Sequence, residues 1–226
     1  MIEDWGQAAG DTWSSLVAYA PGFLSASWLA LQISILVILL SWACGLAAAL
    51  GKISPYRFIR WPFQFYVWFV RGTPTLIQIF IVYFGLPQVG VRMSPFVAGV
   101  IALGVNSGAY VAEIVRGGLL AIPKGQTESS LALGMSYWQL MSRIILPQVV
   151  RIILPPITNE ATTTLKNTSL LSTITVVELT LHAQIVIART FRPFDFYIVA
   201  AVLYLIMTTL LTHLSARLER HYARRQ

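Results

Sequence analysis

Long apolar runs, separated by short polar clusters, dominate the pattern of residues along this chain. No Asp, Glu, Lys, Arg or His occurs from Thr12 to Gly51, and residues 72–91 and 93–112 form two further uncharged windows. A helix that crosses the hydrocarbon core of a membrane needs roughly 20 apolar residues. The pattern therefore predicts an all-α, polytopic membrane helix bundle rather than a soluble domain with an unusually apolar core.

The apolar segments predict about five transmembrane helices within a single domain that covers residues 1–226. We expect them within residues 23–50, within 61–86, at about 95–119, from just after 147 to near 166, and at about 196–216. The first segment is longer than a bilayer core requires, so it tilts or starts late. A further helical, partly embedded piece is expected over residues 172–187. Because no basic residue precedes Lys52, we expect the first segment to be retained rather than cleaved as a signal peptide.

Composition agrees with a lipid environment. The hydrophobic fraction is 56% and the charged fraction only 11%, whereas about 25% of residues are charged in a typical soluble domain. The net charge of +7 does not indicate nucleic-acid binding, because the basic residues bracket apolar segments instead of forming one patch. The single cysteine, Cys44, lies inside an apolar segment and is interpreted as a small packing residue.

The distribution of basic residues predicts the orientation of the helices. With five crossings, one side of the membrane receives Lys52, Arg57, Arg60, Arg116, Lys124, Arg143, Arg151, Arg217, Arg220, Arg224 and Arg225. The opposite side receives only Arg92, Arg189 and Arg192. Since cytoplasmic loops of membrane proteins carry an excess of Lys and Arg, we expect a periplasmic N-terminus and a cytoplasmic C-terminus.

The loop between the third and fourth predicted helices, at about residues 120–147, combines helix formers with helix breakers. It reads as a short amphipathic helix, a glycine break, a second apolar helix and a proline stop. Glu128 is expected near the start of the first helix, where a negative charge suits the helix dipole. Gly134 can end that helix in a left-handed conformation, and Pro147 can begin the next one. On these features alone, the loop is either an interfacial helix in the headgroup layer or a docking surface.

The same loop resembles the signature loop of the permease subunits of ATP-binding-cassette (ABC) importers. In that family a Glu-Ala-Ala triplet is followed by Gly and then by Ile-x-Leu-Pro, and this chain departs from the pattern only in having two small serines for the two alanines. The helix of the family docks on the ATPase subunit and transmits its closure. The resemblance therefore implies a coupling role for Glu128, Ser129, Ser130, Leu133, Gly134, Ile144, Leu146 and Pro147.

Other segments resemble the polar amino-acid permeases of the histidine/glutamine/arginine type, in collinear order from about Lys52 to Thr180. They are residues 71–78, 110–117, 146–149, 155–160, 166–171 and 178–180. In the first of these, Pro74 removes a backbone donor and favours a break in the second helix. Arg71 either marks this break or extends to the cytoplasmic surface. The gate or hinge candidates are Arg71, Gly72, Thr73, Pro74 and Gln78.

The resemblance implies a type I importer fold in the bacterial inner membrane and a subunit that moves polar or charged amino acids from periplasm to cytoplasm by alternating access. The implied partners are a pair of ATPase subunits, a second permease of the same or a paralogous chain, and a periplasmic amino-acid-binding protein. The sequence contains no Gly-x-x-x-x-Gly-Lys-Ser/Thr phosphate loop. We therefore expect no cofactor on this chain, with ATP and magnesium bound by the ATPase partner. No metal site and no enzyme active site is predicted.

Polar residues within the predicted third and fourth helices suggest a water-accessible path. Charged side chains at membrane depth cost about 2.5–3.5 kcal/mol each on insertion scales, so they require a reason. The helical period places three polar positions of the third helix on one face, beside a stripe of small residues at Gly104, Gly108 and Ala112 that suits close helix contact. The substrate-path candidates are Asn106, Tyr110, Glu113, Asn159, Glu160, Thr163, Lys166 and Asn167.

These candidates have alternative interpretations. A carboxylate such as Glu160 could receive the ammonium of an amino acid, and Lys166 or a hydroxyl could receive the carboxylate. Equally, Glu113 could pair with Arg116, and Lys166 could cap a helix end near water. At the level of function, the alternatives are a secondary transporter driven by an ion gradient and a membrane scaffold that transports nothing. The loop around Glu128 argues against both.

Overall fold

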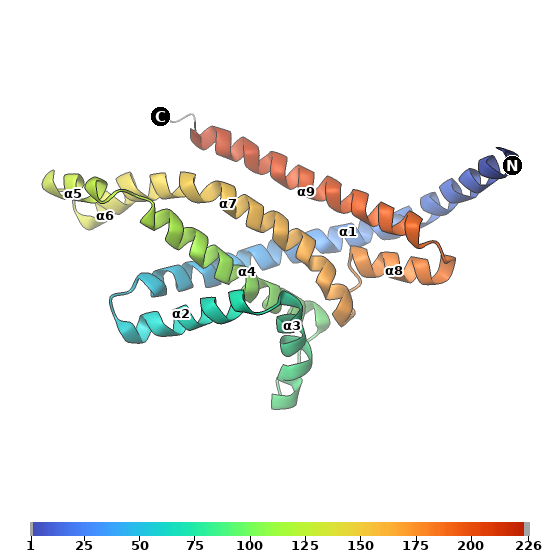
Figure 1. Cartoon of the computed structure of the whole chain (residues 1–226), viewed down its shortest axis with the longest axis horizontal. Coiled ribbons are helices and arrows are strands. Elements are labelled where there is room, and N and C mark those ends of the chain that lie inside the picture. Colours follow the sequence, from blue (N-terminus) through green and yellow to red (C-terminus); the bar gives the residue numbers. More distant parts are fainter. Residues whose placement is uncertain (1, 224–226) are drawn as a thin grey trace.

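The computed structural model describes the backbone of residues 2–223 and the side chains of residues 16–217 and 220. All regular elements in this described part are helical (Figure 1). In chain order they are α1 (Ile2–Ile53), α2 (Arg57–Gly72), α3 (Thr75–Phe80), η1 (Ile81–Gly85), η2 (Leu86–Val89), α4 (Pro95–Leu120), α5 (Lys124–Ala132), α6 (Tyr137–Leu140), η3 (Met141–Ile145), α7 (Leu146–Asn167), η4 (Thr168–Ile174), α8 (Leu179–Thr190) and α9 (Pro193–Ala223). Arg224 and Arg225, which contribute to the expected orientation, lie outside the described residues.

The membrane-spanning elements confirm the predicted bundle. Four stretches are long and apolar enough to cross a membrane, namely Leu16–Ile53, Pro95–Leu120, Tyr137–Ile174 and Pro193–Arg217. A fifth span is formed by α2 together with the segment from α3 to η2, which bend by 112° relative to one another. The stretch Leu16–Ile53 has 38 residues, far more than the roughly 20 that a perpendicular helix needs, so α1 crosses at a tilt or extends beyond the hydrocarbon core.

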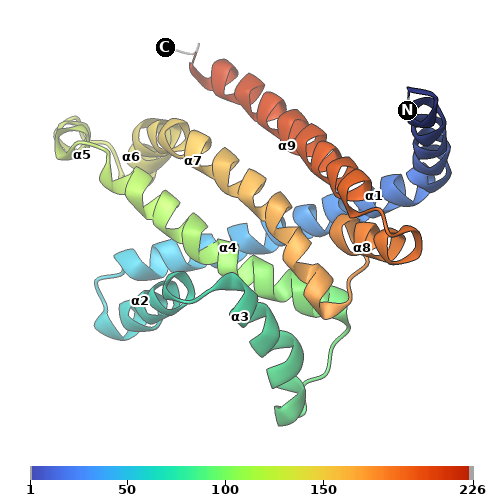
Figure 2. The ribbon, with the colours of Figure 1, turned by 45° about the vertical axis from the view of Figure 1, so that its right-hand side comes forward.

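Helices α1 and α4 cross at the centre of the bundle and form its tightest contact (Figure 2). The stripe of small residues predicted on α4 makes this contact possible. A Cβ atom on Gly104 would lie 2.5 Å from the side chain of Leu40, and one on Gly108 would lie 2.8 Å from Cys44. Ala112 is completely buried. Small residues at a helix interface let two backbones approach closely, and van der Waals packing then stabilises the pair in lipid.

The predicted break in the second span is confirmed at residues 73–74. Helix α2 ends at Gly72, and both Thr73 and Pro74 have extended backbone conformations before α3 begins. The side chain of Gln78 reaches back and donates to the backbone oxygens of Val70 (2.8 Å) and Thr73 (3.1 Å). These bonds satisfy carbonyls at the end of α2 that have no partner within the helix. The segment from α3 to η2 consequently projects away from the bundle (Figure 2).

The expected stop at Pro147 is wrong, although Pro147 does lie in the first turn of α7, as expected for a residue that begins a helix. Residues 137–174 form one continuous helical stretch, in which α6, η3 and α7 follow each other without a break. The turn η3 is π-helical, and the N–H of Leu146 donates to the carbonyl of Met141. A wider turn directly before a proline accommodates the missing N–H and the bulky ring without ending the helix. The loop therefore connects rigidly to the fourth span.

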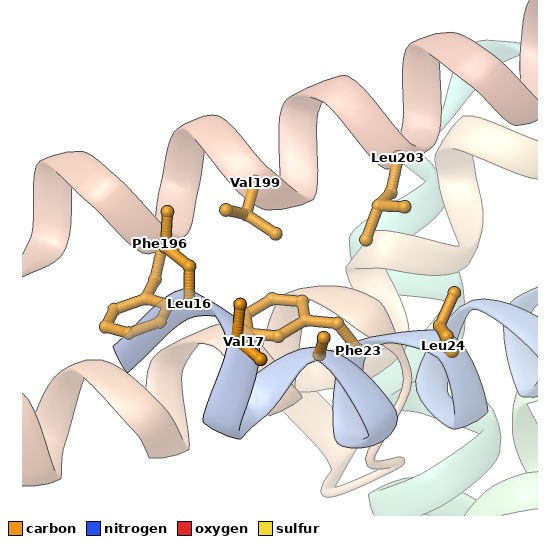
Figure 3. Close-up of a pocket in the computed structure, with 8 residues that line it drawn as sticks. Leu16, Val17, Phe23, Leu24, Phe196, Val199 and Leu203 are labelled. Atoms are coloured by element: carbon orange, nitrogen blue, oxygen red, sulfur yellow. The ribbon is translucent and has the colours of Figure 1, made fainter. Parts of the chain in front are cut away.

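The last third of the chain differs from expectation in its boundaries. Instead of one helix over residues 172–187, the 3₁₀ turn η4 ends at Ile174, and α8 starts only at Leu179 because Glu178 caps it. Helix α9 begins at Pro193 and runs alongside α1 at one end. There the rings of Phe23 and Phe196 stack with centroids 5.9 Å apart. Figure 3 shows the groove that opens beside them, lined only by apolar side chains of the two helices.

Candidate functional site

The loop after α4 forms a compact tip at one end of the molecule (Figure 1). Helix α5 ends near Gly134, whose backbone has φ +76°, as the sequence predicted. Ser136 then starts α6 with a capping box, in which its hydroxyl accepts from the N–H of Gln139 and the Gln139 side chain accepts from the N–H of Ser136. Both helix ends are thus fixed by local bonds. The tip is a defined surface rather than an irregular loop.

The coupling candidates are mostly exposed on this tip. Leu133 is 82% exposed, and Trp138 of α6, which was not among the candidates, is 75% exposed. The side chains of Glu128, Ser129, Leu146 and Pro147 are also exposed, Ile144 is half-buried, and Ser130 is buried with its hydroxyl bonded to the carbonyl of Gln126. One detail of the prediction is wrong: Glu128 lies beyond the first turn of α5, which has no acidic residue because the helix already starts at Lys124.

The polar face predicted on α4 is turned towards α2 and α3. Asn106 is only 4% exposed, and its side-chain amide donates to Gln78 Oε1 at 3.0 Å. Since Gln78 in turn bonds to Thr73 and Val70, Asn106 connects α4 to the break between α2 and α3. Two candidates that the sequence placed in different groups, a path residue and a hinge residue, therefore contact each other directly.

Glu113 lies at the centre of a charged cluster that joins three helices. It bonds to Lys52 at the end of α1 and accepts from Arg116 Nε (3.2 Å) and Arg116 Nη2 (2.7 Å) on its own helix. The nearest guanidinium nitrogen of Arg71, at the end of α2, lies 3.9 Å away. The alternative in which Glu113 pairs with Arg116 is thus confirmed. Lys52 was not among the predicted site residues, because its partner is 61 positions away in the sequence.

Glu160 lies against the neighbouring face of α4, where α7 packs. Its Oε1 accepts from the hydroxyl of Ser107 at 2.7 Å, and the Ser107 hydroxyl lies 3.2 Å from that of Thr164. Next to Glu160 is a small cavity of about 30 Å³, which these three residues line together with Ser41 and Trp42. Glu160 therefore faces inward from α7, and no cation contacts its carboxylate among the described residues.

The neighbouring candidates on α7 point outward. Asn159 and Lys166 are exposed, Thr163 donates to the carbonyl of Asn159 at 3.0 Å, and Asn167 is half-buried where α7 passes into η4. Helix α7 therefore has two polar faces. The inward face carries Glu160 and Thr164, and the outward face carries Asn159 and Lys166.

Sequence reasoning missed the structural importance of Glu178. Its side chain is fully buried, caps α8 by accepting from the N–H groups of Thr180 (2.9 Å) and Leu181 (3.0 Å), and accepts from the Tyr204 hydroxyl at 2.6 Å. Burial raises the pKa of this carboxyl, and the hydrogen bonds from Thr180 and Tyr204 oppose that shift. An acidic residue directly before a helix is a recognisable capping signal, whereas the contact with Tyr204 is not.

Replacing Glu178 with alanine is expected to lower the free energy of unfolding by about 2–4 kcal/mol, because two N–H groups and a hydroxyl lose their acceptor in a buried place. Thermal unfolding of the purified protein in detergent measures this effect. Glu178→Gln keeps an acceptor oxygen and should retain most of the stability. An alanine variant as stable as the parent would show that the cap contributes little.

The chain is similar to known proteins over most of its length. Residues 41–226 match the family described as "Binding-protein-dependent transport system inner membrane component". The probable amino-acid ABC transporter permease protein YckA of Bacillus subtilis is 41% identical over 179 residues, or 79% of each chain. The glutamine transport system permease protein GlnP of Escherichia coli K12 is 37% identical over 210 residues, covering 92% of this chain and 96% of GlnP.

A solved structure agrees with this placement. One chain of the crystal structure of an amino acid ABC transporter with histidines superimposes with a TM-score of 0.86 at 38% identity, covering 92% of this chain and 97% of the other. The methionine transporter MetNI, at 20% identity and a TM-score of 0.72, shares the fold. The resemblance found in the sequence is confirmed, and an ABC importer is supported over a transporter driven by an ion gradient. The chain belongs to the family of inner-membrane components of binding-protein-dependent transport systems, the permease subunits of ABC importers.

Proposed function

We propose that this chain is the translocating subunit of an importer for polar or charged amino acids, which it moves from periplasm to cytoplasm by alternating access. The amino-acid and glutamine transport named for relatives at 41% and 37% identity supports the substrate class. The observation that carries the mechanism is the tip built from α5 and α6. Its large apolar side chains Leu133 and Trp138 are exposed at the end of the molecule, and such surfaces mark docking sites.

In this proposal, a pair of ATPase subunits binds the tip and holds the ATP and magnesium. Because α6, η3 and α7 are continuous, a displacement of the tip passes directly into the fourth span. ATP-driven closure would then favour one of two global states of the permease, and the loaded periplasmic binding protein would bias the same equilibrium from the other side.

We further propose a periplasmic N-terminus and a cytoplasmic C-terminus. The C-terminal ends of α1 and α4 and the tip lie at one end of the molecule (Figure 1). Lys52 is in the last turn of α1, Arg116 is close to the end of α4, and Lys124 starts α5. A concentration of basic residues favours the cytoplasmic side. An alkaline phosphatase fusion after Arg92 is expected to be active. An inactive fusion there would contradict this topology.

A second permease subunit, of the same or a paralogous chain, is part of the proposal. Two spans are largely uncovered within the chain. Of the most apolar window in each, only 22% is buried in residues 137–174 and only 17% in residues 193–217. The outward face of α7 carries Asn159 and Lys166, which would be costly against lipid chains. A facing subunit would enclose these outward polar groups in a shared aqueous path. On the adjacent face of α7, Glu160 would receive the ammonium of the amino acid.

Reconstitution tests the proposed function. Proteoliposomes that contain the permease, the ATPase and the binding protein encoded beside it are offered L-glutamine, L-histidine, L-arginine and L-glutamate in turn. Uptake of at least one of them should require ATP and all three proteins. Uptake that persists without ATP and follows an imposed ion gradient would instead support a secondary transporter, and no uptake of any amino acid would reject the substrate class.

A further inference from the structure

The side chain of Arg71 has a position that the coupling and path assignments leave unexplained. It extends from the last turn of α2 towards α4, where its guanidinium carbon lies 5.4 Å from the centre of the Tyr110 ring. This distance fits a cation–π contact, which fixes the position of the charge without occupying its N–H donors. Within the described part of the chain, the guanidinium makes no hydrogen bond, and the side chain is 45% exposed.

The charges around Arg71 do not balance. Glu113 is the only carboxylate in the cluster, and it is hydrogen-bonded to Lys52 and to Arg116. Arg71 is 3.9 Å from Glu113, beyond hydrogen-bonding distance, so it shares a carboxylate whose charge two closer cations already compensate. Three cations facing one anion leave a net positive charge. In a partly buried place this imbalance requires water or an anion nearby.

A cavity of about 470 Å³ opens in front of this unbalanced cluster. Lys52, Trp68, Arg71, Tyr110 and Glu113 contribute to its walls. A few hundred Å³ with a small number of directed polar groups is typical of small-molecule sites. A planar guanidinium with free N–H groups matches the geometry of a carboxylate, which it can bind through two parallel hydrogen bonds.

The two charged sites of the path lie at similar depth along α4. Ser107 contacts Glu160 and Tyr110 contacts Arg71, and these two positions lie on neighbouring faces of α4, about 60° apart around the helix axis. Three residues correspond to a rise of about 4.5 Å along a helix. An amino acid that moves along α4 therefore passes a guanidinium next to α2 and a carboxylate next to α7 in succession, and each can bind one of its two charged groups.

We propose that Arg71 is a binding residue for the α-carboxylate of the transported amino acid, held in position by Tyr110 and Glu113. The proposal rests on the function proposed above and adds to it the residue that recognises the acidic group of the substrate. A phosphate of an anionic phospholipid has related chemistry and is the competing occupant. The charged cavity favours the amino acid, because lipid chains beside it would have to pack against Arg71 and Glu113.

The test uses pairs of compounds that differ only in the carboxylate: L-arginine and agmatine, L-histidine and histamine, L-glutamine and 4-aminobutanamide. The pair is chosen whose amino acid is taken up in the reconstitution experiment. Binding of both compounds to the permease–ATPase complex is measured in nanodiscs made of zwitterionic lipid. The parent should bind the amino acid at least about tenfold more tightly than its partner, since charge-assisted bidentate hydrogen bonds are the strong ones.

The variants separate recognition from structure. Arg71→Gln should reduce the preference for the amino acid to below about threefold, because it weakens the binding of only the compound that carries the carboxylate. Arg71→Lys should retain part of the preference, because Lys keeps the charge without the planar fork. Arg57→Gln, an exposed arginine at the start of the same helix, should leave the preference unchanged. ATPase activity of each complex confirms its assembly.

Two results would overturn the proposal. One is a preference for the carboxylate that survives in Arg71→Gln while uptake by the parent complex is intact, which rejects the binding residue but leaves the proposed function standing. The other is an effect of Arg71→Gln that appears only in nanodiscs containing phosphatidylglycerol, which would assign the site to a lipid phosphate. Failure of the parent to take up any amino acid would instead reject the function itself.

Discussion

Replacing Glu128 with arginine should reduce ATP-driven uptake at least tenfold while leaving the membrane bundle intact. Glu128 is exposed in the middle of α5 and makes no hydrogen bond or ion pair within the described part of the chain. Substitutions at such positions usually change the free energy of unfolding by less than about 0.5 kcal/mol. A large loss of transport must therefore arise at the surface that contacts the ATPase, where a reversed charge opposes docking and can cost several kcal/mol.

Two measurements distinguish lost docking from lost folding. Co-purification of the ATPase with the permease should fall in Glu128→Arg, and thermal unfolding of the isolated permease should not change. Arg57→Glu provides the matched control, because it reverses an exposed charge that lies outside the tip. Full uptake and normal ATPase binding in Glu128→Arg would remove the tip from the coupling mechanism.

The number and order of the spans could be predicted because exposing a charge to lipid is costly, so segments that cross the membrane lack charged residues. Uncharged windows such as residues 93–112 must lie in the membrane, and α4 at Pro95–Leu120 agrees closely with the expected segment. The break after Gly72 was equally predictable, since the missing donor of Pro74 acts locally. Local chemistry that needs no distant partner is readable from the sequence alone.

Features that depend on neighbours could not be predicted in this way. Pro147 looks like a helix stop, but a π-helical turn before it keeps the fourth span continuous with the tip. Glu178 could be recognised as a cap, but its bond to Tyr204 joins residues 26 positions apart. Lys52 and Ser107, which contact the two central carboxylates, carry no sequence signal, because their partners are 61 and 53 positions away.

The two carboxylates Glu113 and Glu160 also show that contacts between distant residues could not be predicted from the sequence. By spacing alone, Glu113 and Glu160 were equivalent candidates for the path. The structure places Glu113 among three cations from α1, α2 and α4, whereas Glu160 has only hydroxyl groups beside it. An ammonium arriving from outside can form a new ion pair with Glu160, but at Glu113 it would compete with Lys52 and Arg116. Glu160 is therefore the stronger candidate for binding substrate, although its role stays a prediction.

Glu160→Gln should accordingly reduce uptake by about tenfold to a hundredfold, the loss expected when a charge-assisted hydrogen bond worth about 1.5–3 kcal/mol becomes a neutral one. Glutamine has the same size and still accepts from the hydroxyl of Ser107, so the packing between α4 and α7 is kept. Removing a partly buried charge that has no cation beside it should leave the thermal stability unchanged or raise it. A decrease in transport with no decrease in stability would identify an interaction with the substrate.

Ser107→Ala and Asn159→Ala complete this experiment. Ser107→Ala removes the hydrogen bond to Glu160 but keeps the charge, so uptake should fall only a fewfold, consistent with a neutral donor that orients the carboxylate. Asn159→Ala changes the adjacent, outward face of α7 and reports whether that face also lines the path. If Glu160→Gln and Asn159→Ala both transported at the parental rate, neither face of α7 would contact the solute, and the aqueous path would have to run along the neighbouring face of α4, past Tyr110 and Arg71.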